Sequence, residues 1–499
     1  MSSSQFQSAN EERRRVHHEA DVVVVGAGVF GCAVAFALAK QGRSVLLLER
    51  WLQEPDRIVG ELLQPGGISA LEKLGLAHCT EDIDAIPVYG YEVIYYGEGV
   101  NIPYPPNAGG ANSTKGTQEY TNEKGGRPEG RAFHHGRFIS QLRRACASQA
   151  NITIVETEVT DTITSEFQPQ VLGVKSRTRN PQTGKKEEDY YFGQLTIIAD
   201  GYDSKFRKQY IAMKPIIKSK FYALELIDCP LPAPFHGTVI LGDASPVLLY
   251  QIGTHETRAL IDIPENLPAA SVKNGGVRGY LRNTVLPTLP TQMQPSFEAA
   301  LADGKIPKSM PNSFLPPSTQ MEKGFVILGD AMNMRHPLTG GGMTVAFNDV
   351  VLLSNLLAPE RIPDLGDTVA IKQAMKDFHW QRKGLSSIIN ILSMALYSLF
   401  AANDRQLSAL KKGCFAYFKR GGNCIDGPSS LLAGIIRQPL VLVYHFFAVA
   451  VLSIWLVIRD TVGGFLGLWK LPLAVEESIR VFYKACVVIF PFIFSEMRT

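Results

Sequence analysis

"DVVVVGAGVFG", residues 21 to 31, decides the fold, because in it a run of valines meets three glycines. Four consecutive valines form a short continuous apolar run, which is typical of a parallel strand covered on both faces. Residues 32 to 43, CAVAFALAKQGR, continue as an apolar helix, and residues 44 to 50, SVLLLER, as a second strand. The order strand, glycine turn, helix, strand predicts an α/β chain with a Rossmann-type nucleotide-binding domain.

The glycines of this turn and one acidic residue point to a bound dinucleotide. Gly26, Gly28 and Gly31 have GxGxxG spacing, and Glu49 closes the second strand. Such glycines let the backbone approach a pyrophosphate at a helix N-terminus, while the carboxylate accepts hydrogen bonds from ribose hydroxyls. An acidic residue at position 49 favours FAD or NAD over NADP. The alternative is a tight turn that binds no ligand.

Two further strands end in an acidic turn, at residues 199 to 208, ADGYDSKFRK, and at residues 329 to 347, GDAMNMRHPLTGGGMTVAF. Asp200, in the first turn, is equally compatible with a structural role. Asp330, in the second, is placed to accept from a ribityl hydroxyl of a flavin. A glycine inside a helix costs up to about 1 kcal/mol, so the run from Gly340 to Gly342 predicts a helix start. Its bare N-terminal amides would face a flavin ring and stabilise negative charge there.

The composition divides the chain into parts. Short strands with prolines between them predict a largely antiparallel substrate domain, and a later strand, turn and helix predict a return to the first domain. A segment rich in Gly, Asn, Thr and charge has little to bury. We expect a disordered N-terminus at 1–20, an FAD-binding domain at 21–190 with a mobile insertion at 105–131, a substrate domain at 191–323, a return to the FAD-binding domain at 324–380 and a C-terminal helical, membrane-associated region at 381–499.

Charge and cysteine content exclude several classes of function. The 50 lysines and arginines nearly balance the 47 acidic residues, and no basic run suggests a nucleic acid as partner. The seven cysteines are scattered without metal-ligand spacing, so we expect reduced thiols, no metal site and a protein that faces the cytosol. The polar N-terminus lacks the apolar core of a signal peptide.

Two apolar runs near the C-terminus predict contact with membrane lipid. Residues 440 to 458 are just long enough for a span, but His445 lies inside the run and arginines flank both of its ends. Residues 481 to 494 are too short to cross and contain Lys484 and Pro491. We expect a pair of helices inserted in one leaflet, with packing on the protein core as the alternative.

Together, the motifs resemble those of a known family. GxGxxG, Asp-Gly and Gly-Asp in this order are similar to the FAD-dependent aromatic hydroxylase superfamily. EPDRIVGELLQPGG, HHGRF, ADGYDSKFRK, SMPNSFLPP, GDAMNMRHPLTGGGMTVAF and PLVLVYHFFAVA narrow the resemblance to squalene monooxygenases, from about residue 20 to the C-terminus. The chain lacks the long hydrophobic N-terminal extension of animal members and carries the 105–131 insertion, so it resembles a fungal form.

The resemblance implies site residues by position. Tyr91 matches a tyrosine near the flavin and is the expected catalytic residue, orienting an active-site group through its hydroxyl; without the resemblance it would be a core tyrosine. The alternative for each arginine is a surface ion pair. His134, His135 and His336 are expected to be structural. Together with Gly26, Gly28, Gly31, Asp200 and Gly342, the expected FAD contacts are Val29, Phe30, Glu49, Arg50, Arg57, Arg137, Val159, Asp330 and Met343.

The resemblance also implies a reaction: squalene is epoxidised to (3S)-2,3-oxidosqualene with O₂, in ergosterol synthesis. NADPH would supply the electrons through a separate membrane-bound flavin reductase, and no second nucleotide fingerprint is visible in the chain. The implied location is the cytosolic face of the endoplasmic reticulum membrane, with lipid droplets as a second location. Two alternatives stay open: another flavin enzyme on lipids, such as a polyprenyl reductase or ring hydroxylase, and a non-catalytic flavin-binding membrane protein.

Overall fold

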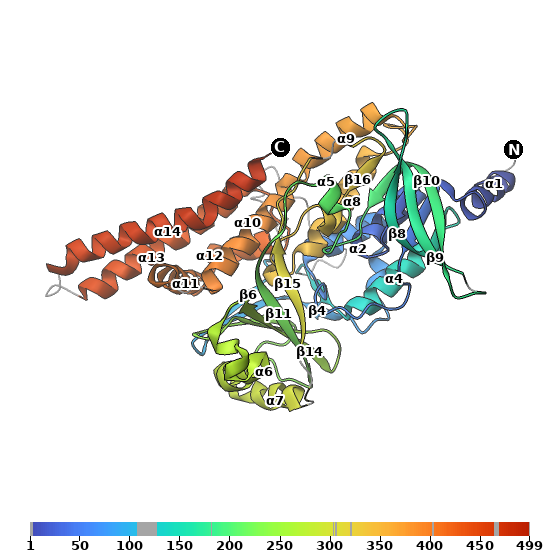
Figure 1. The fold of residues 1–499 in the computed structure, drawn as a ribbon. Helices are drawn as coiled ribbons and strands as arrows, with labels where there is room; N and C mark the ends of the chain where they lie inside the picture. Colours follow the sequence, from blue (N-terminus) through green and yellow to red (C-terminus); the bar gives the residue numbers. More distant parts are fainter. Residues whose placement is uncertain are drawn as a thin grey trace.

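A computed structural model describes residues 3–106, 127–180, 182–302, 304, 307–319, 322–401, 404–463 and 469–498. Three parts are visible in Figure 1: a first sheet with helices around it, a second sheet below it, and a pair of long C-terminal helices that extends to one side. The site described below lies where the two sheets meet.

The first sheet has a parallel core in the order β8-β2-β1-β10-β16. The valines of β1 are buried on both faces, as their continuous run predicts. Helices α2 (Val29–Lys40), α3 (Pro65–Leu74), α4 (His135–Ala147) and α8 (Gly342–Leu356) share a hydrophobic core with this sheet. The strands are β1 (Glu19–Val25), β2 (Val45–Glu49), β8 (Ile152–Thr164), β10 (Lys186–Ile198) and β16 (Phe325–Ile327), with β9 (Val171–Arg179) joining β8 to β10 by antiparallel pairing. The predicted Rossmann-type sheet is confirmed.

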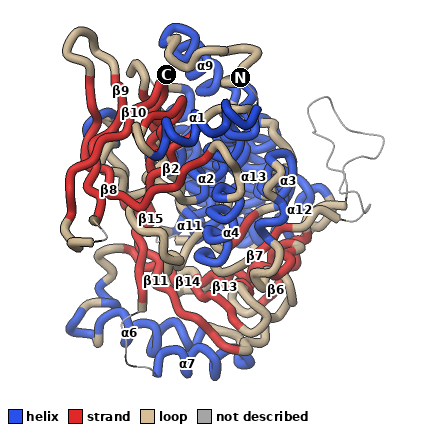
Figure 2. The backbone as a smooth tube through the Cα atoms, turned by 90° about the vertical axis from the view of Figure 1, so that its right-hand side faces the viewer, coloured by secondary structure: helices blue, strands red, loops and turns tan. Residues whose placement is uncertain are grey.

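The second sheet has the order β15-β11-β14-β13-β12-β5-β6 and is antiparallel except for the pair β5 and β12. Helices α6 (Gly276–Tyr280) and α7 (Gln294–Ala302) pack on one of its faces, as Figure 2 shows. The strands are β5 (Gly90–Tyr95), β6 (Glu98–Pro103), β11 (Ile216–Ile227), β12 (His236–Leu241), β13 (Val247–Gln251), β14 (Glu256–Pro264) and β15 (Lys308–Phe314). A small sheet of β3 (Leu62–Leu63), β7 (Gly130–Ala132) and β4 (Ile86–Val88) lies between the two.

The structure moves the boundaries that composition predicts. β5 and β6 come from the segment 21–190 but belong to the second sheet, and β10 continues the first sheet to Ile198, past the expected boundary at 191. Pairing between strands far apart in the chain decides sheet membership, and local composition does not record it. Most of the expected insertion at 105–131 lies outside the described residues, while its last residues enter β7.

The expectation of a disordered N-terminus at 1–20 is wrong over α1 (Ser3–Arg15). Arg14 is buried, and its guanidinium donates to the carbonyl oxygen of Ala150 (2.6 Å) and to the hydroxyl of Thr153 (3.0 Å). Arg13 pairs with Glu19 and Asp21 at the start of β1. In the sequence these arginines are typical of a solvated segment. In the structure their side chains bind α1 to the first sheet.

The C-terminal part is helical, as predicted. It consists of α9 (Thr368–Gln381), α10 (Lys383–Phe400), α11 (Arg405–Phe418), α12 (Asn423–Leu432), α13 (Pro439–Val462) and α14 (Leu471–Met497). Among the described residues, α10, α13 and α14 are long and apolar enough to cross a membrane. The apolar window of α10 is 67% buried in the protein, against 39% for α13 and 28% for α14. The apolar run at 481–494 was expected to be too short to cross a membrane. It is part of the longer helix α14, with Pro491 inside the helix.

Candidate active site

The turn between β1 and α2 shows why each of its glycines is needed. Gly26 has a φ of +102°, and a Cβ there would lie 2.5 Å from the carbonyl oxygen of Ala199. A Cβ on Gly31 would lie 1.7 Å from the carbonyl oxygen of Gly26. A Cβ on Gly28, which precedes α2, would meet nothing within 4 Å. Packing explains the first two glycines, whereas Gly28 leaves room for a ligand at the helix N-terminus.

Glu49 lies at the end of β2, beside this turn. Its Oε2 accepts a hydrogen bond from the amide of Ala27 at 2.7 Å and lies 3.6 Å from a guanidinium nitrogen of Arg143. The carboxylate therefore fixes the glycine turn against the neighbouring strand. Its Oε1 accepts a hydrogen bond from the amide of Trp51 at 3.2 Å. Binding of ribose hydroxyls by Glu49 stays a prediction.

The acidic turns after β10 and β16 lie side by side, because these strands are parallel neighbours. Asp330 lines a cavity, and its carboxylate lies 3.9 Å from Nη2 of Arg57. The guanidinium of Arg57 also lies over the ring of Tyr202, 5.3 Å from its centre. Asp200 is largely buried, which raises the pKa of its carboxyl, and its Oδ1 has no hydrogen-bond partner among the described residues.

The three glycines at the start of α8, Gly340 to Gly342, differ in their surroundings. Gly340 has a φ of +62°, which favours glycine. A Cβ on Gly341 would lie 2.4 Å from Cγ2 of Ile389 on α10, so this glycine lets the two helices approach. A Cβ on Gly342 would meet nothing within 4 Å, and Gly342 is the first residue of α8. The start of α8 therefore borders open space at Gly342, and α8 begins at the glycine run as predicted. That its N-terminal amides face a flavin stays a prediction.

A cavity connects these turns to the second sheet. Its polar end is lined by Gly28, Val29, Phe30, Arg57, Asp330, Gly342 and Met343, and its apolar end by Val239, Leu248, Leu260, Met310 and Leu338. A glycine-lined end with two helix N-termini suits the pyrophosphate and ring of FAD. A Cβ would meet nothing within 4 Å at Gly28 or at Gly342, so the N-termini of α2 and α8 both leave space that bound FAD would use. The residues present therefore fit this cofactor.

Tyr91 lines the cavity from β5 and is buried. Its hydroxyl accepts a hydrogen bond from Nε2 of Gln64 and lies 3.4 Å from the carbonyl oxygen of Thr339. The same Nε2 donates to Thr339 at 2.8 Å, and the hydroxyl of Tyr104 donates to Oε1 of Gln64. Burial holds the pKa of Tyr91 well above its usual range, so the phenol stays protonated. The hydroxyl thus holds the turn that leads into the glycine run.

Seven of the expected FAD residues do not line the cavity: Gly26, Gly31, Glu49, Arg50, Arg137, Val159 and Asp200. Arg50 is exposed, with its guanidinium over the ring of Trp51, and Arg137 lies 3.9 Å from the carboxylate of Asp84. Val159 is packed in the core of the first sheet. Asp200 also lies outside the lining, although its two chain neighbours line the cavity. The structure therefore does not bring the whole expected set together around the cavity. The expected residues that line it are Gly28, Val29, Phe30, Arg57, Tyr91, Asp330, Gly342 and Met343.

Sequence reasoning missed a charged cluster in the cavity wall. Glu61 lines the cavity and is buried, and Nε and Nη2 of Arg258 each donate to one of its oxygens at 2.9 Å. The hydroxyl of Tyr250 also donates to Glu61, at 3.2 Å. Burial raises the pKa of Glu61, and Arg258 opposes this shift. The available signal was a lone arginine in the apolar strand ETRALIDIP, which in a buried strand requires an acidic partner.

Comparisons with known proteins agree with this geometry. The squalene epoxidase family model matches residues 192–470, and the FAD dependent oxidoreductase model matches residues 21–54. Among solved structures, the flavin-dependent brominase Bmp2 is 16% identical with a TM-score of 0.64, over 86% of this chain and 98% of that one. The p-nitrophenol 4-monooxygenase PnpA of Pseudomonas putida is 16% identical with a TM-score of 0.62, over 84% and 98%. At this identity, the two likenesses support the fold alone.

Several proteins compared by sequence are much more similar to this chain than the two solved structures are. Squalene epoxidase ERG1 of Gibberella zeae is 62% identical over 98% of both chains. Squalene epoxidase erg1 of Aspergillus fumigatus is 54% identical over 98% of this chain and 96% of that one. Squalene monooxygenase of Mus musculus is 42% identical over 96% of this chain and 78% of that one. The chain therefore belongs to the squalene epoxidase family of FAD-dependent monooxygenases, and it resembles these fungal members more than the mouse enzyme.

Proposed function

We propose that this chain epoxidises squalene to (3S)-2,3-oxidosqualene, an early step of sterol synthesis. Squalene, O₂, NADPH and a proton give the epoxide, water and NADP⁺, so one oxygen atom enters the product and the other is reduced to water. The observation that carries the proposal is the cavity, which joins flavin-type turns to an apolar wall. Family membership supplies the choice of squalene among hydrocarbon substrates.

The polar end of the cavity is the proposed FAD site. Bound FAD supplies the activation of O₂ and the transfer of one oxygen atom to the alkene. Gly28 leaves the α2 N-terminus open to the pyrophosphate, and Asp330 is placed to accept from a ribityl hydroxyl. Arg57, on the same wall, supplies a positive charge toward the phosphates. The N-terminus of α8 at Gly342, which borders open space, would stabilise negative charge on the bound cofactor.

The apolar end holds and orients the substrate. Leu248, Leu260 and Met310 come from three strands of the second sheet and face the same space. Burying a hydrocarbon there gains roughly 25 cal/mol for each Å² of apolar surface removed from water. The same side chains exclude water from the reacting atoms, which protects the oxygen transfer from wasteful side reactions.

Tyr91 is proposed as a positioning residue. Its hydroxyl is already engaged with Gln64 and Thr339, and its ring faces the cavity. We infer that it holds the turn before Gly340 in place beside the proposed FAD site, without exchanging a proton with the substrate. The expected FAD contacts of Arg50, Arg137 and Val159 stay predictions, because these side chains lie outside the cavity lining.

NADPH is proposed to act through a separate membrane-bound flavin reductase. The chain carries a single GxGxxG turn, and the cavity beside it is needed for FAD. A reductase in the same membrane as its partner would meet it by diffusion in two dimensions. We therefore place the protein on the cytosolic face of the endoplasmic reticulum membrane, with lipid droplets as a second location.

The helices α13 and α14 are proposed to lie in one leaflet. Their exposed faces carry large apolar side chains such as Val451, Trp455 and Ile479. Charged residues of α11 accompany them: Lys412 pairs with Asp460 of α13 at 2.7 Å, and α11 also packs against α14. A spanning hairpin would draw these charges into the hydrocarbon region at a cost of several kcal/mol. Shallow insertion leaves the charges in water and still places the cavity near dissolved squalene.

Squalene and its saturated analogue squalane separate the proposal from its alternatives. With reductase and NADPH, the FAD-loaded protein should consume O₂ when squalene is added and show no added consumption with squalane, which lacks the double bonds. With a non-catalytic flavin-binding protein, adding squalene would not increase the consumption of O₂. A reduced or hydroxylated product, in place of the epoxide, would indicate another flavin enzyme acting on lipids.

A further inference from the structure

The far end of α14 returns to the body of the protein and is held there by polar contacts. Nζ of Lys383 donates to the carbonyl oxygens of Glu496 and Arg498, the latter at 3.1 Å. A ring nitrogen of His379 lies 3.3 Å from the same carbonyl oxygen of Arg498. A cation at a helix C-terminus satisfies its last carbonyls and favours the helix dipole. The last turn of α14 is therefore docked against α9 and α10.

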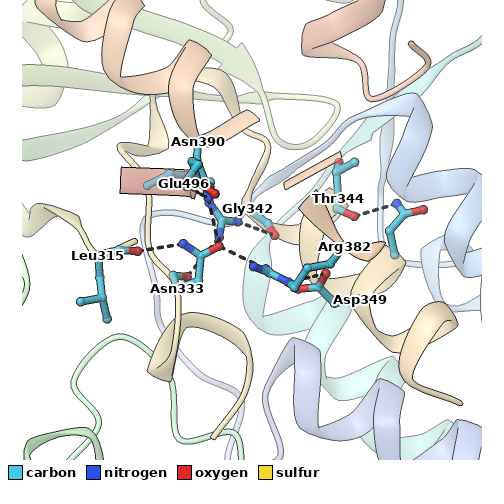
Figure 3. Close-up of polar contacts among 10 residues, drawn as sticks. Leu315, Asn333, Gly342, Thr344, Asp349, Arg382, Asn390 and Glu496 are labelled. Carbon is cyan, nitrogen blue, oxygen red and sulfur yellow. Dashed lines mark hydrogen bonds and ion pairs between the residues drawn. The ribbon is translucent and has the colours of Figure 1, made fainter. Parts of the chain in front are cut away.

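The side chain of Glu496 points inward from this turn, as Figure 3 shows. It is 4% exposed, and its Oε1 accepts a hydrogen bond from Nδ2 of Asn390 at 2.8 Å. Asn390 lies on α10 and is fully buried, and the same Nδ2 lies 3.2 Å from Oδ1 of Asn333. A carboxylate from the last helix thus reaches the loop between β16 and α8 through one amide side chain.

Asn333 is the centre of this network (Figure 3). Its Oδ1 accepts from Nη2 of Arg335 at 2.8 Å and from Nη2 of Arg382 at 3.1 Å, besides Asn390. Its Nδ2 donates to the carbonyl oxygen of Leu315 at 2.8 Å. The amide therefore uses both its donor and its acceptor to fix the loop after β16.

Arg335 joins this hydrogen-bond network to the proposed flavin site. It lines the cavity, and its Nη1 lies 3.5 Å from the carbonyl oxygen of Gly342, the first residue of α8. Arg382 pairs closely with Asp349, with contacts down to 2.6 Å. Buried Arg335 is opposed by the charges of Asp330, Asp349 and Glu496, of which Asp330 acts most strongly. Burial raises the pKa of Glu496, while the positive charges of Arg382, Lys383 and Arg335 favour its ionised form. A buried charge that loses its compensation is strongly destabilising.

We propose that the C-terminal turn of α14 is a positioning element of the flavin site, in which Glu496, through Asn390 and Asn333, holds Arg335 beside the N-terminus of α8. The inference rests on the proposed function only in requiring that the wild-type protein binds FAD. Coupling between two sites is reciprocal, so FAD binding in turn stabilises the docked end of α14. A helix pair that contacts the membrane is thereby linked to the cofactor.

Three full-length variants test this link. Glu496→Ala removes the carboxylate, Glu496→Gln keeps an oxygen that accepts from Asn390, and Glu476→Ala removes an exposed carboxylate of the same helix that pairs with Arg480. We expect the FAD dissociation constant to rise about tenfold in Glu496→Ala, about threefold or less in Glu496→Gln, and not at all in Glu476→Ala. Glutamine restores the hydrogen bond but not the charge, which sets its intermediate value.

Hydrogen exchange supplies a readout that does not depend on turnover. In the wild type, FAD should slow amide exchange both at residues 333–343 and in the last turn of α14, at residues 493–497. In Glu496→Ala the protection at 493–497 should no longer respond to FAD. Unchanged FAD affinity together with an unchanged response at both segments would overturn the proposal. A wild-type protein that binds no FAD would instead contradict the proposed function.

Discussion

Tyr91 gives the sharpest test at the scale of single residues. Tyr91→Phe deletes the hydroxyl that joins Gln64 and Thr339 but keeps the ring in the cavity wall. One such hydrogen bond contributes about 1 kcal/mol, so we expect turnover to fall about fivefold while FAD content stays that of the wild type. Tyr95→Phe, on the same strand but outside the cavity lining, is the control. Full turnover would exclude a positioning role for the hydroxyl, and parallel loss of flavin would assign it to packing.

Asp330 tests the flavin end of the cavity. Asp330→Ala removes the acceptor that we assign to the ribityl chain, and loss of such a partner typically costs about 1 to 3 kcal/mol. The FAD dissociation constant, followed by flavin fluorescence, should therefore rise about tenfold or more. Asp161→Ala changes an exposed carboxylate on β8 and should leave the affinity unchanged. Equal affinities in the two variants would contradict the assignment.

How far single site residues can be predicted depends on where they lie. Gly28 and Asp330 follow strand ends that the motifs place, and both line the cavity. Arg137 is near the site by position, but the direction of its side chain follows from Asp84, which no local pattern indicates. The pair of Glu61 and Arg258 joins positions 197 residues apart, so only the folded arrangement of the strands reveals it.

At the scale of elements, two adjacent glycines at the start of α8 have different roles. Gly341 is required for packing, and Gly342 leaves space for a ligand. Gly341→Ala places a Cβ 2.4 Å from Ile389 and should lower the melting temperature of the FAD-free protein. Gly342→Ala places a Cβ in open space, so the FAD-free protein should melt normally while FAD affinity falls. Ile389→Ala should partly restore Gly341→Ala and have no such effect on Gly342→Ala. Equal effects of the two substitutions on FAD-free melting would contradict the division.

Elements were predictable where a local pattern specifies them. The valine run, the glycine turn and the apolar helix gave β1 and α2, and the glycine run gave the start of α8. The pairing of β5 with β12 was not predictable. It joins residues such as Tyr91 and Gly237 that are far apart in the chain, with the strands β8, β9 and β10 of the first sheet between them. The helix α1 was not predicted for a different reason. Its arginines are typical of solvated segments, and only the folded structure shows that they bind Thr153 on β8 and Asp21 on β1.

At the scale of the whole molecule, the exposed face of α13 and α14 should determine membrane attachment (Figure 1). Val451, Trp455 and Ile479 are 61%, 52% and 65% exposed, so replacing all three by serine leaves the packed face intact. Each large apolar side chain contributes roughly 1.5 to 3 kcal/mol on burial, and the triple variant should move from the microsomal pellet to the supernatant while still binding FAD. Phe167→Ser, at a 97% exposed site on another face, should stay in the pellet.

The same arrangement predicts on which side the ends of the hairpin lie. The end of α14 is docked beside the FAD-binding part, so a tag after Thr499 should be cut by protease added outside sealed microsomes. A glycosylation site inserted between Gly463 and Lys470, in the connection from α13 to α14, should stay unmodified. Glycosylation there would show that the hairpin crosses the bilayer, contrary to insertion in one leaflet.

The central claim is that the two sheets and the cavity between them place an alkene against an oxygen-activating flavin. Mass spectrometry of squalene incubated with the FAD-loaded protein, NADPH, a flavin reductase and ¹⁸O₂ tests this most directly. We predict a product that contains a single ¹⁸O atom in a terminal 2,3-epoxide, with no label when ¹⁸O is supplied as water. Unlabelled product, two incorporated atoms, or squalene recovered unchanged beside active reductase would contradict the account.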